Sequence, residues 1–121
     1  MTTNQGSLAG KRILVIEDDF MIANHLAMVL AAHGAEIVGP AGTVQGGLTL
    51  VADAERIDGA ILDVNLRGEM VYPVADALRR KGVPMVFLTG YDGGAAAAGH
   101  VDVPCLRKPA KAEQLIRALF G

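Results

Sequence analysis

The chain has little of several things that mark other classes of protein. It has one cysteine in 121 residues, Cys105, so no intramolecular disulfide can form and a reducing compartment is expected. It has no tryptophan and only 4% aromatic residues, so its 51% of hydrophobic residues are mainly aliphatic. This composition is typical of a folded domain with an aliphatic core and excludes a disordered chain.

Long apolar runs are also missing. Only four apolar residues follow Lys11 and Arg12 before Glu17, which is too few for a secretory signal, and no run approaches the length of a membrane span. We therefore expect a cytoplasmic protein that does not insert into a membrane.

Strong charge of either sign is absent as well. Eleven basic and thirteen acidic residues give a net charge of -2, and the longest basic run is the trio at residues 79–81. Direct nucleic-acid binding is not expected, because it calls for a clustered positive face. A chain of this length is expected to form one domain, with a mobile tail at residues 1–10 and the domain itself at 11–121.

Apolar residues at helical spacing predict four well-formed helices, at residues 20–33, 44–51, 71–81 and 112–119. Asp19 and Thr43 are expected to cap the first two. Residues 92–100 contain alanines and glycines but no large apolar anchor, so they predict only a marginal helix. Short apolar runs between these helices predict five strands, at residues 11–16, 35–39, 59–62, 83–88 and 101–106.

Strands that alternate with helices through short connections predict a three-layer α/β domain with a doubly wound, five-stranded parallel sheet. Several of the strands end on reactive groups: Glu17 and Asp18 follow the first, Asp63 the third, Thr89 the fourth and Lys108 the fifth. In a parallel sheet these ends lie along one edge, where ligands bind. The sequence therefore predicts a single polar site made from four strand ends.

The chemistry of that site follows from its groups. Carboxylates at Glu17, Asp18 and Asp63 would repel one another unless a cation lay among them, and a few hard oxygens suit Mg²⁺ that keeps several waters. With Mg²⁺, a hydroxyl and an ammonium present, the matching reaction is phosphoryl transfer to Asp63. The site is therefore predicted to bind a metal and to accept a phosphoryl group.

These residues, in this order and at these spacings, resemble the receiver domain of two-component response regulators over residues 11–120. The resemblance implies a flavodoxin-like sheet with strand order 2-1-3-4-5, phosphorylation of Asp63, and Mg²⁺, or Mn²⁺ in its place, as cofactor. Its metal ligands would be Glu17, acting through water, Asp18, Asp63 and the backbone carbonyl of Asn65. Thr89, Gly90 and Lys108 would contact the phosphoryl group, and the bond from Lys108 to Pro109 would be cis.

Two features depart from the usual receiver pattern. Cys105 stands three positions before the lysine, where receivers commonly carry an aromatic switch residue. The run Phe87-Leu88-Thr89-Gly90-Tyr91 instead is similar to the FAT GUY subgroup, which lacks that aromatic. Tyr91 is therefore a candidate for the switch residue, whereas Cys105 is expected to be a small buried apolar residue.

Three functions follow from these residues. The first is a stand-alone receiver that takes a phosphoryl group from a histidine kinase or phosphotransfer protein and signals by protein contact, or serves as a phosphate shuttle or sink. It would catalyse only its own phosphorylation and dephosphorylation. The second, a phosphatase of the haloacid dehalogenase type, needs an aspartate where the chain has Asn65. The third is a binding module that is never phosphorylated, although every acceptor-site residue is present.

Overall fold

The computed structural model describes residues 6–90, 100 and 102–121. A five-stranded parallel sheet runs through the middle of the domain in the order β2-β1-β3-β6-β7, which confirms the predicted order of five strands. The strands are β1 (Arg12–Ile16), β2 (Glu36–Ala41), β3 (Gly59–Asp63), β6 (Met85–Thr89) and β7 (Cys105–Arg107).

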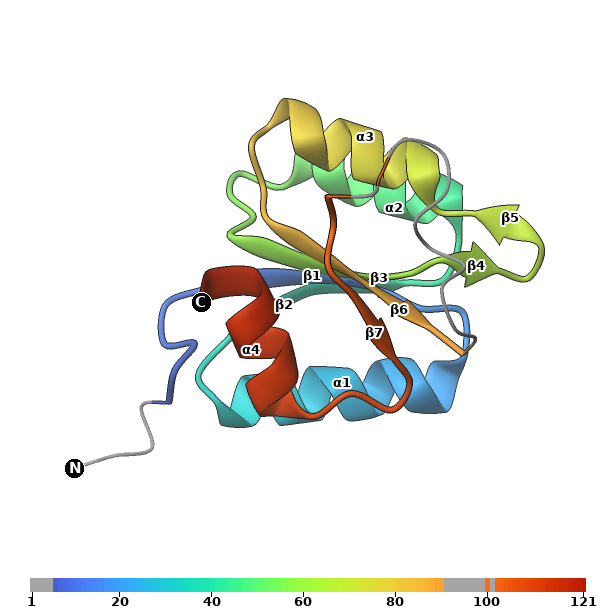
Figure 1. The fold of residues 1–121 in the computed structure, drawn as a ribbon. Coiled ribbons are helices and arrows are strands. Elements are labelled where there is room, and N and C mark those ends of the chain that lie inside the picture. Colours follow the sequence, from blue (N-terminus) through green and yellow to red (C-terminus); the bar gives the residue numbers. More distant parts are fainter. Residues whose placement is uncertain (1–5, 91–99, 101) are drawn as a thin grey trace.

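Within the part of the chain that the structure describes, two helices cover each face of the sheet (Figure 1). Helices α2 (Val44–Asp53) and α3 (Tyr72–Arg80) lie on one face, and α1 (Phe20–Ala32) and α4 (Ala112–Phe120) lie on the other. All four predicted well-formed helices are thus present. The marginal helix predicted at residues 92–100 lies outside the described residues except for His100, which belongs to no helix or strand.

Alternation along the strands divides the interior into two apolar cores. In β1, Leu14 and Ile16 pack with α2 and α3, whereas Ile13 and Val15 pack with α1 and α4. All five residues of β3 are buried, as expected for a central strand with helices on both faces. Asp63, the last residue of β3, is therefore held at the end of a fully buried strand.

The strand and tail boundaries differ from the prediction in several places, including β6, which begins at Met85 instead of residue 83. β2 continues through Pro40 to Ala41 instead of ending at residue 39, because the register shifts beside it and Ala41 accepts a hydrogen bond from the Glu17 amide at 2.9 Å. β7 begins at Cys105 and is shorter than expected. The predicted mobile tail is wrong for residues 6–10, because Leu8 is fully buried and its amide donates to the His33 carbonyl at 2.9 Å.

A short antiparallel hairpin was not predicted. Strands β4 (Asn65–Leu66) and β5 (Glu69–Met70) pair directly after β3, where the sequence suggested only a polar loop. The hairpin lies at the carboxyl end of the sheet and so forms part of the wall around Asp63 (Figure 1).

Helix α3 is tied to the chain that leads into β7. The ring of Tyr72 stacks on His100 with centroids 4.8 Å apart, and His100 Nε2 lies 2.8 Å from Asp76 Oδ1. Two turns along the helix, Arg79 makes a bidentate contact with Asp102 at 2.9 and 3.0 Å. His100 is thus a buried packing residue.

Gly47 has a packing role in α2 that outweighs its weak helix propensity. A Cβ atom there would lie 3.0 Å from Val74 Cγ2 and 3.1 Å from Ile16 Cδ1, so α2 approaches α3 and β1 closely at this point. We expect Gly47→Leu to lower the free energy of unfolding by about 1–2 kcal/mol through overpacking. Urea denaturation checks this against Thr49→Leu, which adds the same side chain to an exposed position of α2. Equal effects of the two variants would contradict it.

None of the helices in the described ranges is long and apolar enough to cross a membrane.

Candidate functional site

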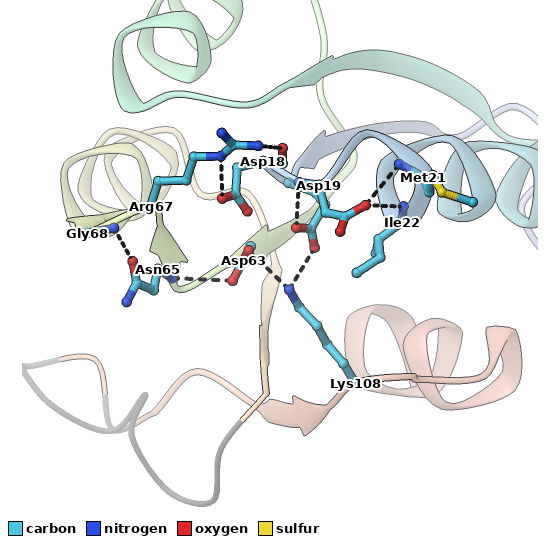
Figure 2. A network of polar contacts seen from close by, with 10 residues as sticks. Asp18, Asp19, Met21, Ile22, Asp63, Asn65, Arg67, Gly68 and Lys108 are labelled. Carbon is cyan, nitrogen blue, oxygen red and sulfur yellow. Dashed lines mark hydrogen bonds and ion pairs between the residues drawn. The ribbon is translucent and has the colours of Figure 1, made fainter.

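A cavity of about 690 Å³ opens at the carboxyl ends of β1, β3 and β6. Six of the residues predicted to form one site line it together: Glu17, Asp18, Asp63, Thr89, Gly90 and Lys108. They come from four strand ends, and Figure 2 shows the side chains of Asp18, Asp63 and Lys108 pointing toward one another. The predicted convergence of strand ends is therefore present in the fold.

The turn from β1 into α1 holds the first two carboxylates. Asp19 caps the helix as predicted, with its Oδ1 accepting from the amides of Met21 at 2.9 Å and Ile22 at 3.1 Å. Its own amide donates to Glu17 Oε2 at 3.1 Å. These hydrogen bonds of Asp19, to the first turn of α1 and to Glu17, hold the turn in place, and Glu17 and Asp18 line the cavity.

Asp63 is held from its backbone and from its side chain. It ends the buried strand β3, its side chain is only 7% exposed, and the amide of Asn65 donates to its Oδ1 at 3.3 Å. Lys108 Nζ lies 3.1 Å from the other oxygen, Oδ2. One edge of the carboxylate is thus bound by the ammonium, and the group faces the cavity rather than the core.

Lys108 lies between two acids. Its Nζ is 2.9 Å from Glu17 Oε1, but the approach falls outside hydrogen-bond geometry, so the contact is an ion pair that leaves Oε1 without a hydrogen bond. The Lys108 amide donates to the Thr89 carbonyl at 2.8 Å, which aligns the residue with the end of β6. The bond from Lys108 to Pro109 is cis, as predicted.

Burial and contact set the ionisation of these groups. Burial raises the pKa of Glu17 to about 7, against the lowering effect of Lys108. For Lys108, burial alone would lower the pKa, but the contacts with Glu17 and Asp63 outweigh it and the pKa is raised. Burial also opposes ionisation of Asp18, yet its contacts with Asp63, Glu17 and Arg67 hold its pKa below the usual value. In the metal-free site, the pKa of Glu17 is therefore raised while the pKa of Asp18 is lowered.

The three carboxylates fit a divalent metal. Glu17, Asp18 and Asp63 each offer an oxygen, and these atoms lie within 4.8 Å of one another. A buried carboxylate oxygen without a hydrogen bond, Glu17 Oε1, lies among them. Hard oxygen donors at this spacing are what Mg²⁺ or Ca²⁺ requires.

Thr89 ends β6 and Gly90 follows it, and both line the cavity. Thr89 is 7% exposed, and nothing in the described structure lies within 4 Å of the position a Cβ would take on Gly90. The small residue therefore leaves the cavity open beside the hydroxyl. Tyr91, the candidate switch residue, lies outside the described residues.

Cys105 corrects an expectation, since it is exposed rather than buried. β7 is an edge strand in which only the middle residue, Leu106, packs against a core, whereas Cys105 and Arg107 face the other way. Apolar character in a strand sequence does not show which alternate position faces the core at an edge.

Arg67 is the residue of the site that sequence reasoning missed. It lies in the β4–β5 turn, and its Nε donates to Asp18 Oδ2 at 3.2 Å (Figure 2). Gly68 follows it and donates its amide to Asn65 Oδ1 at 2.6 Å. The signal available was the Asn-x-Arg-Gly pattern directly after Asp63, in which an Asn and a Gly favour a tight turn.

Solved structures with this fold include close relatives of the chain. SdrG from Sphingomonas melonis Fr1 is 39% identical, with 92% of this chain and 97% of that one covered at a TM-score of 0.79. A response regulator from Burkholderia pseudomallei, solved with a phosphorylated aspartic acid, a calcium ion and citrate, is 28% identical over 90% of this chain and 66% of that one, with a TM-score of 0.76.

Curated sequences give the same result. The transcriptional regulatory protein PdtaR from Mycobacterium tuberculosis is 32% identical over 91 residues, which are 74% of this chain and 44% of PdtaR. The chain spans less than half the length of the curated relatives it matches. No protein-family model matches the chain.

The flavodoxin-like sheet and the acidic cavity at its carboxyl edge define a class of signalling module. The chain belongs to the receiver domains of response regulators, which are signalling modules of two-component systems.

Proposed function

We propose that this receiver accepts a phosphoryl group on Asp63 from a histidine kinase or a phosphotransfer protein. The observation that carries the proposal is the position of the Asp63 carboxylate, which faces the cavity with Lys108 Nζ at 3.1 Å and oxygens of Glu17 and Asp18 within 4.8 Å. SdrG, which is 40% identical in its second structure, adopts a BeF3-activated conformation, and the Burkholderia protein carries a phosphorylated aspartic acid. Both relatives support the proposal.

The metal would be held by Asp18, Asp63 and the backbone carbonyl of Asn65, with Glu17 acting through water. Mg²⁺ is the natural ion, and Mn²⁺ has the same ligand preference. When bound, it supplies positive charge between the carboxylates and the phosphoryl oxygens, which would otherwise repel each other.

The chain's own residues have distinct tasks in the transfer. An oxygen of Asp63 attacks the phosphorus of a phosphohistidine, the new O–P bond forms as the N–P bond breaks, and the departing imidazole takes up a proton. Lys108 offers a cation to the phosphoryl oxygens, and the Thr89 hydroxyl offers a hydrogen bond. Gly90 leaves room for the donor, because no side chain stands there. Hydrolysis of the aspartyl phosphate by water then returns the carboxylate.

The two alternative functions have weaker support. A phosphatase of the haloacid dehalogenase type needs an acid two residues after the nucleophile, but Asn65 is an amide and its Oδ1 already accepts from the Gly68 amide. A receiver that is never phosphorylated would have no reason to keep a buried carboxylate beside a lysine, since such burial costs free energy. The output would be protein contact or phosphate shuttling, with Tyr91 rather than Cys105 as the candidate switch.

Incubation with acetyl phosphate and Mg²⁺ tests the proposal. We expect one added phosphoryl group by intact mass in the wild type and none in Asp63→Asn or in the presence of EDTA. Asp58→Asn is the control, because Asp58 lies at the opposite end of β3 and contacts Arg12 and Arg56. A phosphoryl group that persists in Asp63→Asn would overturn the assignment of Asp63.

A further inference from the structure

Arg67, in the turn of the β4–β5 hairpin, forms an ion pair with Asp18, one of the three carboxylates of the cavity. Arg67 Nε lies 3.2 Å from Asp18 Oδ2, and its Nη2 lies 3.5 Å from the Asp18 backbone oxygen. Lys108 stands on the other side, in contact with Glu17 and Asp63. Figure 2 shows the two cations approaching the acids from different elements. Each carboxylate thus has a positive group supplied by the chain itself.

The backbone at Arg67 is one that an arginine rarely adopts. Its φ is 57°, and among the described residues it alone has a positive φ without being glycine. Gly68 follows with φ 94°, so both central residues of the turn are left-handed, a combination that favours Asn-Gly or Gly-Gly. Strained positions of this kind tend to occur at functional sites. Here the turn directs a long cationic side chain back over Asp18.

We propose that Arg67 is a tethered counter-cation that competes with the divalent metal for Asp18 and thereby sets the metal affinity of the receiver. This inference rests on the proposed function, because it takes the acidic cavity to be the metal site.

The competition has two physical sources. A metal bound to Asp18 would lie within a few ångströms of the guanidinium, and two cations at that separation repel each other. The hydrogen bond from Arg67 also draws electron density from the carboxylate that the metal needs. The side chain of Arg67 is 80% exposed, so it can turn into solvent, and the penalty on metal binding is modest and sensitive to salt.

Isothermal titration of the metal-free protein with MgCl₂ tests the inference. We expect Arg67→Gln to lower the dissociation constant for Mg²⁺ by about two- to five-fold, the range typical of an exposed ion pair. Arg67→Lys keeps the charge and is expected to stay within about two-fold of the wild type. The gap between wild type and Arg67→Gln is expected to shrink when NaCl is added, which a purely structural effect of the turn would not do.

Arg56→Gln is the matched control. Arg56 pairs with Asp58 at 3.0 Å and is also exposed, but it lies at the opposite end of the sheet from the cavity. The Arg56→Gln substitution removes one positive charge from the molecule and leaves the surroundings of Asp18 unchanged. The Mg²⁺ affinity of this variant is therefore expected to equal that of the wild type. If it gains as much affinity as Arg67→Gln, the effect is one of net charge and the inference is wrong.

Two other outcomes separate this inference from the proposed function. Equal or weaker Mg²⁺ binding by Arg67→Gln would overturn the role of Arg67 and leave the metal site intact. If neither the wild type nor Arg67→Gln binds Mg²⁺ or Mn²⁺, the cavity is not a metal site, and the proposed function and this inference both fail.

Discussion

Lys108→Met is expected to lower the free energy of unfolding by about 2–4 kcal/mol at pH 8 without divalent cations, because it leaves buried carboxylates without their counter-charge. Lys108 Nζ lies 2.9 Å from Glu17 and 3.1 Å from Asp63, and the side chains of both acids are at most 7% exposed. Methionine keeps most of the side-chain volume, so lost packing contributes little. Uptake of a proton by Glu17 limits the cost, since its pKa is already raised.

Urea denaturation in EDTA and in MgCl₂ measures this effect. Mg²⁺ is expected to recover part of the loss, because a bound cation replaces the missing positive charge and stabilises the folded state by mass action. Lys111→Met is the control from the same loop, where the side chain is exposed. Adding Glu17→Gln to Lys108→Met is expected to restore part of the stability in EDTA, because it removes one of the two carboxylates that Lys108 neutralised. A loss no larger than that of Lys111→Met would show that the ion pairs contribute nothing.

The sequence predicted where the acids of the site lie, but not how the chain itself balances their charge. The acids could be assigned to one edge because a parallel sheet brings the carboxyl ends of its strands together, whichever helices lie between them. Their repulsion was expected to require a metal. The structure instead provides two cations, Lys108 on Glu17 and Asp63 and Arg67 on Asp18, which reduce the repulsion before any metal binds.

The elements that sequence patterns missed are short or lie at edges. The β4–β5 hairpin has two residues in each strand, too few for an alternating pattern to show, and its turn carries Arg67 where a turn signal would have Asn or Gly. Cys105 looks like part of a buried strand, but β7 lies at the sheet's edge. Long central elements such as β3 and α1 were predicted well, because burial on both faces or on one helical stripe imposes a regular pattern.

Gly47 shows that helix propensity alone does not decide which residue a helix position needs. Gly47 has a weak helix propensity, yet it is needed in α2 because Val74 and Ile16 approach too closely for a larger side chain. Helix propensity describes an isolated segment, whereas this position is decided by the contact between α2 and α3. Tertiary contacts of this kind cannot be seen in the sequence of one element.

The raised pKa of Glu17 predicts an unusual dependence of stability on pH in the metal-free protein. In the folded state this carboxyl has a pKa of about 7, raised by burial from 4.5, so between these values the folded protein holds a proton that the unfolded chain has released. The stabilisation that protonated Glu17 contributes is therefore complete below pH 4.5, and it is lost as the pH rises toward 7. The loss is about 3 kcal/mol at most.

Urea denaturation in EDTA between pH 5 and pH 8 measures this dependence. We expect the free energy of unfolding of the wild type to fall by about 1–3 kcal/mol over this range, and that of Glu17→Gln to stay nearly constant, because glutamine mimics the protonated form. Saturating Mg²⁺ is expected to weaken or reverse the trend, since the cation binds the ionised carboxylates and is displaced by protons at low pH. Asp19→Asn serves as the control: it changes the neighbouring cap, and asparagine caps a helix as well as aspartate does. A wild type whose stability rises from pH 5 to pH 8 in EDTA would show that Glu17 is ionised throughout, with Lys108 outweighing its burial.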